Sequence, residues 1–224
     1  MAAGNGGDKG TRNLVVAMVL FIVVVGVVFS LISNRSNTTA AVPASVSAED
    51  GYGIVLNPST KPQIDVYVDY QCPACKAFEI LNGGYLNEVI AQNKAKVVYH
   101  PMTFIGPESI LAANAAACAA DENEFVAMNL AIFQDQSGAE NSGKWQGDAM
   151  LNIGKSIGIN SAKFEKCLKD GNYVKWTGNV AAASAKANVN GTPTIFVNGK
   201  ELDRNTEYGD PVKFRAVLAA AGVK

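Results

Sequence analysis

Hydrophobic and polar residues alternate in short periods along most of the chain, but residues 14–32 form one uninterrupted apolar run. This run contains no charged side chain over 19 positions. As a helix it would be about 28 Å long, close to the thickness of the hydrocarbon core of a bilayer. The pattern therefore predicts a transmembrane helix, with a lipid bilayer as the partner of residues 14–32.

Beyond this run, short segments rich in β-branched and aromatic residues predict β-strands. The clearest is residues 64–70, with the sequence Ile-Asp-Val-Tyr-Val-Asp-Tyr. Asn198-Gly199 is a strong signal for a two-residue hairpin between two further strands. The strands predicted in this way are 54–56, 64–70, 95–100, 194–197 and 200–202.

Apolar residues that recur at helical spacing predict the remaining elements. Gly83-Gly84 predicts a break after the first helical segment, and Gly158 predicts the end of another. The last helix is marked by Asp210 as its N-cap and by Pro211 at its first position. The helical segments are 76–80, 85–92, 109–133, 148–157, 161–168, 174–187 and a last one that begins at Pro211.

The order of these elements predicts an α/β fold. A strand–helix–strand unit comes first, and it implies two parallel strands joined by a right-handed crossover. Four helical segments follow, and then two strands and a helix, so residues of about 105–188 form a helical subdomain inserted into the fold. The expected organisation is a tail at 1–13, the membrane helix at 14–32, a flexible linker at 33–53 and one folded domain at 54–222.

Charges around the apolar run predict its orientation. Lys9 and Arg12 precede the run and Arg35 follows it, which favours a cytoplasmic N-terminus. The alternative is a signal peptide cleaved near Val42-Pro43-Ala44, but the run is longer than an ordinary signal sequence. Both interpretations export the rest of the chain. The uncleaved anchor predicts a single-pass protein of the cell membrane with its folded domain outside the cytoplasm.

The composition excludes several classes of protein. Hydrophobic residues make up 48% of the chain, too many for a disordered protein, and 19 basic residues face 20 acidic ones without a basic stripe. Nucleic acid is therefore not an expected partner. His100 is the only histidine, which excludes a histidine-rich metal centre, and its place at the end of a predicted strand favours a structural role.

The candidate chemistry lies in Cys72-Pro73-Ala74-Cys75, where a predicted strand meets a predicted helix. A cysteine at a helix N-terminus faces unpaired backbone N–H groups, which lower its pKa and favour the nucleophilic thiolate. Cys75 lies one turn later and can attack a mixed disulfide formed by Cys72. Two alternatives are an inert structural disulfide and half of a zinc site, completed by the isolated cysteines Cys118 and Cys167.

The sequence resembles the DsbA-like family of the thioredoxin superfamily over residues of about 54–222. The resemblance is carried by Asp-Tyr-Gln-Cys-Pro-Ala-Cys at 69–75 and by Val-Asn-Gly-Thr-Pro-Thr-Ile-Phe-Val-Asn-Gly at 189–199. It implies a thioredoxin fold with a helical insertion, in which Cys72 is the exposed nucleophile and Cys75 the buried resolving thiol. It also implies a cis bond at Pro193, beside the cysteine pair, and backbone hydrogen bonds from Thr192 to an extended substrate.

The same resemblance implies a function. Members of this family donate a disulfide to exported proteins that are unfolded or partly folded, and a membrane quinone reductase of the DsbB or VKOR kind re-oxidises them. They need no cofactor beyond the redox-active disulfide, and no metal. Some members also carry a second disulfide in the helical insertion, which implies a structural bond between Cys118 and Cys167.

Two positions depart from the family pattern. Ala74 stands where the best-known motif has histidine, which predicts a milder oxidant, and Val66 stands where many relatives have an acid. Asp69 is closer to the cysteines and is interpreted as a helix N-terminal acid or a solvated residue. A membrane-tethered reductase or isomerase, and a binding module without enzymatic activity, therefore remain alternatives to the oxidase.

Overall fold

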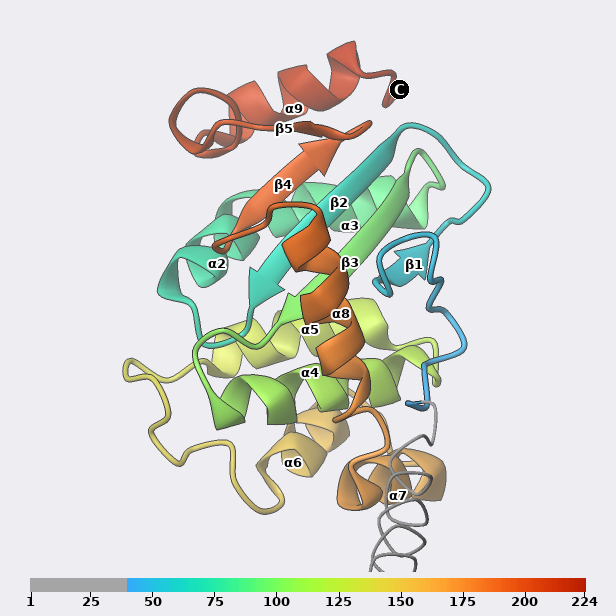
Figure 1. Ribbon diagram of the computed structural model, residues 1–224, viewed down its shortest axis with the longest axis vertical. Coiled ribbons are helices and arrows are strands. Elements are labelled where there is room, and N and C mark those ends of the chain that lie inside the picture. The colour runs from blue at the N-terminus through green and yellow to red at the C-terminus, as the bar shows by residue number, and fades with distance from the viewer. Residues whose placement is uncertain (1–39) are drawn as a thin grey trace, which may run out of the picture. The chain divides into compact units, whose positions relative to one another are not determined.

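A five-stranded sheet forms the centre of the computed structural model, which describes residues 40–224. Its order is β1-β3-β2-β4-β5, and only β2 and β3 run parallel (Figure 1). The strands are β1 (Ile54–Leu56), β2 (Gln63–Asp69), β3 (Lys96–Met102), β4 (Thr194–Val197) and β5 (Lys200–Glu201). The predicted strand–helix–strand unit and hairpin are therefore confirmed.

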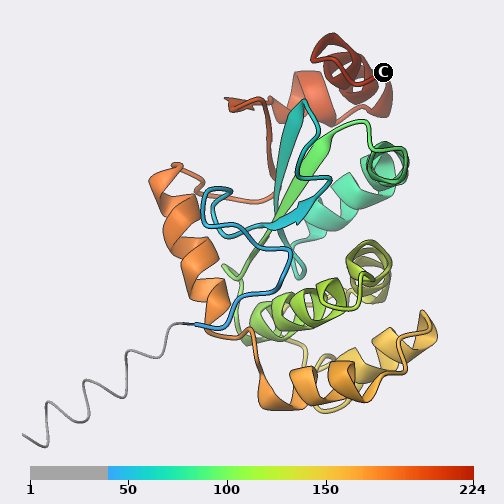
Figure 2. The ribbon, with the colours of Figure 1, turned by 90° about the vertical axis from the view of Figure 1, so that its right-hand side faces the viewer.

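Helices cover both faces of the sheet (Figure 2). Helix α8 lies on one face, the helices from α2 to α3 and α9 lie on the other, and α4 to α7 lie together beyond the carboxyl ends of β2 and β3 (Figure 1). Their bounds are α2 (Pro73–Phe78), η1 (Glu79–Gly83), α3 (Gly84–Ala91), α4 (Pro107–Ala120), α5 (Phe125–Asp135), α6 (Ala149–Ser156), α7 (Ala162–Asp170), α8 (Trp176–Lys186), η2 (Arg204–Tyr208) and α9 (Pro211–Ala220).

The central strand β2 is buried along most of its length because it has a neighbour on each edge and helices on each face. Ile64, Val66 and Val68 have no exposed surface, and Tyr67 on the opposite side of the strand is also buried. The strand ends at Asp69, directly before the cysteine motif. The buried central strand of the sheet therefore fixes the position of that motif.

The predicted break at Gly83-Gly84 is wrong. Both glycines have helical dihedral angles, and the chain stays helical from Pro73 to Ala91, with the π-helical turn η1 in the middle. A Cβ atom at Gly83 would lie 2.5 Å from Oε1 of Glu79. The missing side chain therefore leaves room for a buried carboxyl group inside a continuous helix.

The single long helix predicted at 109–133 is also wrong, since the structure divides it into α4 and α5. The polar turn Asp121–Glu124 separates the two helices. Asn123 adopts a left-handed conformation with φ 63°, which asparagine tolerates better than most residues and which no α-helix contains.

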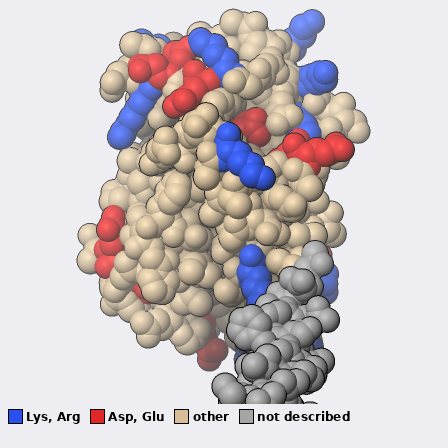
Figure 3. Space-filling view, viewed as in Figure 1, with Lys and Arg blue, Asp and Glu red and all other residues tan. Residues whose placement is uncertain are grey.

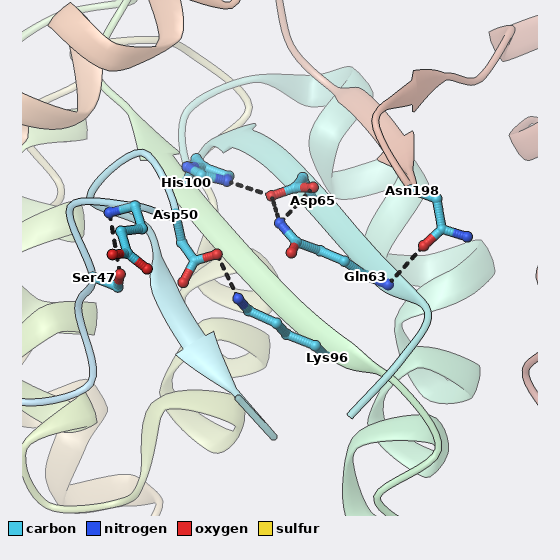
Figure 4. Close-up of polar contacts among 8 residues, drawn as sticks. Ser47, Asp50, Gln63, Asp65, Lys96, His100 and Asn198 are labelled. Carbon is cyan, nitrogen blue, oxygen red and sulfur yellow. Dashed lines mark hydrogen bonds and ion pairs between the residues drawn. The ribbon is translucent and has the colours of Figure 1, made fainter. Parts of the chain in front are cut away.

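The flexible linker predicted at 33–53 ends earlier than expected. Asp50 forms an ion pair with Lys96 on β3, with 2.5 Å between the carboxylate and the ammonium group (Figure 4). The indole N–H of the buried Trp176 donates to the carbonyl of Tyr52 at 2.9 Å. The residues just before β1 are thus held by the folded domain, because a buried indole and a partly buried ammonium group each need a partner.

The predicted tail at 1–13, the predicted membrane helix at 14–32 and the first part of the linker lie outside the described residues. Within residues 40–224, no helix is both long enough and apolar enough to span a bilayer. The membrane helix stays a prediction from the sequence.

Candidate active site

Cys72 is placed at the N-terminus of α2 by the end of β2 and by Pro73. It is the N-cap residue, and Pro73 takes the first helical turn, where the missing N–H costs nothing. The carbonyl of Cys72 accepts from the N–H groups of Cys75 and Lys76, each at 3.1 Å. The Cys72 side chain is half-buried, Cys75 is fully buried, and both thiols are free.

The two cysteines differ sharply in acidity. The pKa of Cys72 falls to about 6, because the Cys75 thiol donates to its sulfur and backbone N–H groups of the first helical turn face it, against an opposing effect of burial. The pKa of Cys75 rises well above its usual value, because burial disfavours its thiolate and its proton is shared with Cys72. At neutral pH the pair therefore carries one thiolate, and it lies on Cys72.

The loop before β4 brings Thr192 and Pro193 to the cysteine pair. The Thr192–Pro193 peptide bond is cis, as the resemblance implied. The Cys72 sulfur lies 3.5 Å from the carbonyl oxygen of Thr192. The hydroxyl of Tyr208 donates to the carbonyl of Pro193 at 2.9 Å, so η2 holds this loop from the other side.

A groove of about 400 Å³ opens beside the pair. Ala74, Phe78 and Leu81 line it from the active-site helix, and Pro193 and Tyr208 line it from the opposite side. The position that carries histidine in the best-known motif is thus part of a surface that a bound polypeptide can touch.

Asp69 is neither the helix N-terminal acid nor the solvated residue that the sequence predicted. It is fully buried, and the N-cap of α2 is Cys72. Its carboxylate accepts from the hydroxyl of Ser109 at 2.6 Å, from the N–H of Gln71 at 2.9 Å and from the N–H of Ile105 at 3.1 Å. Burial raises its pKa, and these hydrogen bonds oppose the rise. Its own N–H points at the Cys75 sulfur at 3.5 Å, so Asp69 links the buried thiol to the helical insertion.

Gln136 was not predicted as a site residue, and nothing in the sequence around it marks it. It lies at the C-terminus of α5, and its side-chain N–H groups donate to the carbonyls of Tyr70 at 2.7 Å and of Cys72 at 3.1 Å. The insertion therefore holds the turn that carries the nucleophile.

His100 belongs to the sheet and contacts neither cysteine. Its Nε2 atom lies 3.1 Å from a carboxylate oxygen of Asp65 (Figure 4). Its ring stacks on Tyr67 with 4.0 Å between the ring centroids. The structural role predicted for His100 agrees with these contacts.

Cys118 on α4 and Cys167 on α7 form a disulfide, with 2.02 Å between the sulfurs. This is the pairing that the resemblance implied. A zinc site completed by these two cysteines would need both as thiolates, so the disulfide removes the ligands on which that alternative depended.

Comparison with known proteins agrees with this geometry. The family model described as Thioredoxin matches residues 51–214. No curated protein sequence matches the chain. Among solved structures, MdbA of Actinomyces oris, described as a thiol-disulfide oxidoreductase, is 22% identical with a TM-score of 0.69, and the match covers 82% of this chain and 93% of that one.

Two further structures have the same architecture. DsbA from Mycobacterium tuberculosis in its reduced form is 25% identical over 80% of this chain and 89% of that one, with a TM-score of 0.61. BdbD from Bacillus subtilis in its oxidised form is 21% identical over 82% and 98%, with a TM-score of 0.64. The chain therefore belongs to the thioredoxin family, within which it is a DsbA-like thiol–disulfide oxidoreductase.

Proposed function

We propose that this oxidoreductase donates the Cys72–Cys75 disulfide to exported proteins while they fold. The observation that carries the proposal is the placement of a half-buried Cys72 at the N-terminus of α2 beside a fully buried Cys75, which lowers the pKa of Cys72 to about 6 and raises that of Cys75. A stabilised thiolate favours the reduced form of the pair over its disulfide. The pair therefore tends to accept electrons from substrate thiols.

The reaction follows from which sulfur is exposed. A substrate thiolate attacks the Cys72 sulfur of the oxidised pair, and the bond to Cys75 breaks. A second substrate thiolate then attacks the substrate sulfur of the mixed disulfide and releases Cys72 as a thiolate. Two electrons pass to the cysteine pair, two protons leave the substrate thiols, and Cys75 keeps one of them. The low pKa of Cys72 makes it a good leaving group in the second step.

We further propose that the domain works outside the cytoplasm, anchored by residues 14–32. The charge-free apolar run supports the anchor. The Cys118–Cys167 disulfide supports an oxidising compartment, because structural disulfides rarely persist in the cytosol. A membrane quinone reductase of the DsbB or VKOR kind would then re-oxidise the pair.

The reduction potential tests the direction of electron flow. Equilibration of the full chain with glutathione should give a value of roughly −150 to −185 mV, milder than a DsbA with histidine at the position of Ala74. A value near the −270 mV of thioredoxin would favour a reductase instead. In cells, the Cys75→Ser variant should accumulate as mixed disulfides with exported proteins. A chain that traps no substrate and oxidises no reduced protein would instead be a binding module.

A further inference from the structure

The groove beside the cysteine pair is lined by both apolar and charged side chains. The apolar ones include Ala74, Phe78 and Leu81, here called the floor, and Leu81 is 46% exposed. The cationic ones are Arg204 on η2 and Lys213 on α9, here called the rim. An extended polypeptide joined to Cys72 would therefore meet apolar surface and two cationic side chains in the same groove.

Arg204 and Lys213 are available to a ligand. Both are exposed, and neither forms an ion pair with any residue from 40 to 224. Burial raises the pKa of Tyr208, and the charge of Arg204 opposes that rise. Arg204 and Tyr208 both belong to η2 and both line the groove, and Tyr208 donates to the carbonyl of Pro193, so Arg204 lies close to the loop that faces Cys72.

Asp210 is the one acidic residue among those that line the groove, and it is already engaged. Figure 3 shows charges of both signs gathered toward the end of the molecule that carries η2 and α9. Asp210, which also lines the groove, accepts from the N–H groups of Val212 and Lys213 at the start of α9. The positive end of that helix therefore stabilises its carboxylate.

Two further acids lie next to the groove. Asp203 accepts from the first N–H groups of η2, and Glu207 lies 3.1 Å from the ammonium group of Lys200. Asp203, Glu207 and Asp210 thus have local partners, whereas the two cations of the rim have none among the described residues. The charge of Glu201 on β5 also acts on Tyr208, but Glu201 does not line the groove.

We propose that Arg204 and Lys213 select polypeptide substrates that carry acidic residues next to the reacting cysteine. This inference rests on the function proposed above, and it names the class of substrate for the same site. An extended chain advances about 3.3 Å per residue, so a groove that begins at Ala74 and Pro193 contacts only the few residues adjacent to the bound cysteine. An apolar residue there would pack on the floor, and an acidic one would pair with the rim.

The test compares two dithiol peptides that differ only in two positions after the first cysteine, Glu in one and Lys in the other. The oxidised full chain in detergent is mixed with each peptide at low salt, and the oxidation rate is measured below saturation. The flanking charges also change the reactivity of the peptide thiols themselves. The rate of each peptide with a small neutral disulfide measures this effect, and the enzyme rates are divided by it. The corrected rate should be about three- to tenfold higher for the acidic peptide, and 0.5 M salt should reduce the ratio.

Variants assign the selectivity to the groove. R204Q together with K213Q should abolish the preference, and R204E with K213E should reverse it. The matched control is K175Q with K186Q, which removes two exposed lysines from the α8 region on the other face of the sheet and should keep the preference. Equal rates with the unmodified chain, or a preference retained by R204Q with K213Q, would overturn the inference. Failure to oxidise either peptide would instead overturn the proposed oxidase function and, with it, its substrate class.

Discussion

Cys72 and Cys75 are three positions apart, but their surroundings give them opposite chemistry. Cys72 faces the N–H groups of the first helical turn and the thiol of Cys75, all of which stabilise a negative charge. Cys75 is fully buried, so its thiolate would lose hydration without equal compensation. The turn that joins β2 to α2 therefore decides which cysteine is the nucleophile and which is the resolving thiol.

The hydrogen bond from Cys75 can be tested separately from its redox role. Serine at position 75 keeps an O–H donor, whereas alanine removes it. Since this bond is the largest cause of the lowered pKa of Cys72, Cys75→Ala should raise that pKa more than Cys75→Ser. The pH dependence of Cys72 alkylation measures both values, and the unmodified reduced chain should be half-maximal near pH 6. Curves for both variants that coincide with that of the unmodified chain would show that the Cys75 hydrogen bond does not lower the pKa.

Ala74 allows a second test at the scale of one side chain. Histidine at this position would offer one charge-assisted hydrogen bond to the Cys72 thiolate, which is worth about 1.5–3 kcal/mol. For a two-electron couple this corresponds to roughly 30–65 mV, so Ala74→His should raise the reduction potential by that amount. Ala74→Gln adds comparable bulk without the charge and serves as the control. An unchanged potential in Ala74→His would mean that the existing donors already saturate the thiolate.

The sequence predicted those site residues that are defined by local patterns. Cys72 and Cys75 stand at a strand-to-helix junction, and a family motif marks Pro193. Asp69 and Gln136 could not be predicted in the same way. The contacts that join Asp69 to the insertion, and Gln136 to the active-site turn, link residues 36 or more positions apart in sequence, so these roles exist only once the insertion has folded against that turn.

At the scale of elements, the active-site helix contains a buried acid that its sequence pattern does not reveal. Glu79 is 3% exposed, one of its oxygens accepts from Asn129 at 3.1 Å, and the other has no partner among the described residues. Gly83 provides the space for it. Gly83, one of the two glycines that predicted a helix break, thus leaves space for a side chain inside a continuous helix. Only tertiary packing decides between these two outcomes.

This acid should make the stability of the protein depend on pH. Burial raises the pKa of Glu79 to about 7, and the hydrogen bond from Asn129 opposes the rise. The folded state therefore keeps its proton between about pH 4.5 and 7, where the unfolded chain loses it, so this group lowers stability as pH rises through that window. Glu79→Gln cannot ionise. The free energy of unfolding of this variant, relative to that of the parent, should therefore be about 3 kcal/mol higher above pH 7 than at pH 4.5.

Urea unfolding of the two proteins at pH 4.5 and pH 8 measures this difference. The control is Glu88→Gln on α3, where the side chain is exposed and the same change of charge should have little effect at either pH. A difference between Glu79→Gln and its parent that does not change with pH would show that Glu79 ionises in the folded protein as easily as in the unfolded chain.

At the scale of the whole domain, the helical insertion contacts the active-site turn and contains a disulfide of its own. Helices α4 to α7 lie beyond the carboxyl ends of β2 and β3, and residues of α4 and α5 reach Asp69 and Cys72 (Figure 1). The Cys118–Cys167 disulfide joins the last turn of α4 to α7, whereas Ser109, the residue of α4 that contacts Asp69, lies in the first turn of that helix. Its effect should therefore fall on stability and much less on thiol exchange.

Replacing both Cys118 and Cys167 with Ala tests this separation. The disulfide closes a loop with a sequence separation of 49, and the chain-entropy model then gives about 4 kcal/mol of stabilisation through the unfolded state. Alanine fits the site because α4 already packs alanines on both sides of Cys118. Urea unfolding, with the Cys72–Cys75 pair oxidised in both proteins, should show a loss of about that size in the free energy of unfolding. In a separate measurement on the reduced pair, the pKa of Cys72 from alkylation should stay near 6. Unchanged stability would mean that α4 and α7 are held by packing alone, and a large shift in the Cys72 pKa would show that the cross-link also controls the active-site turn.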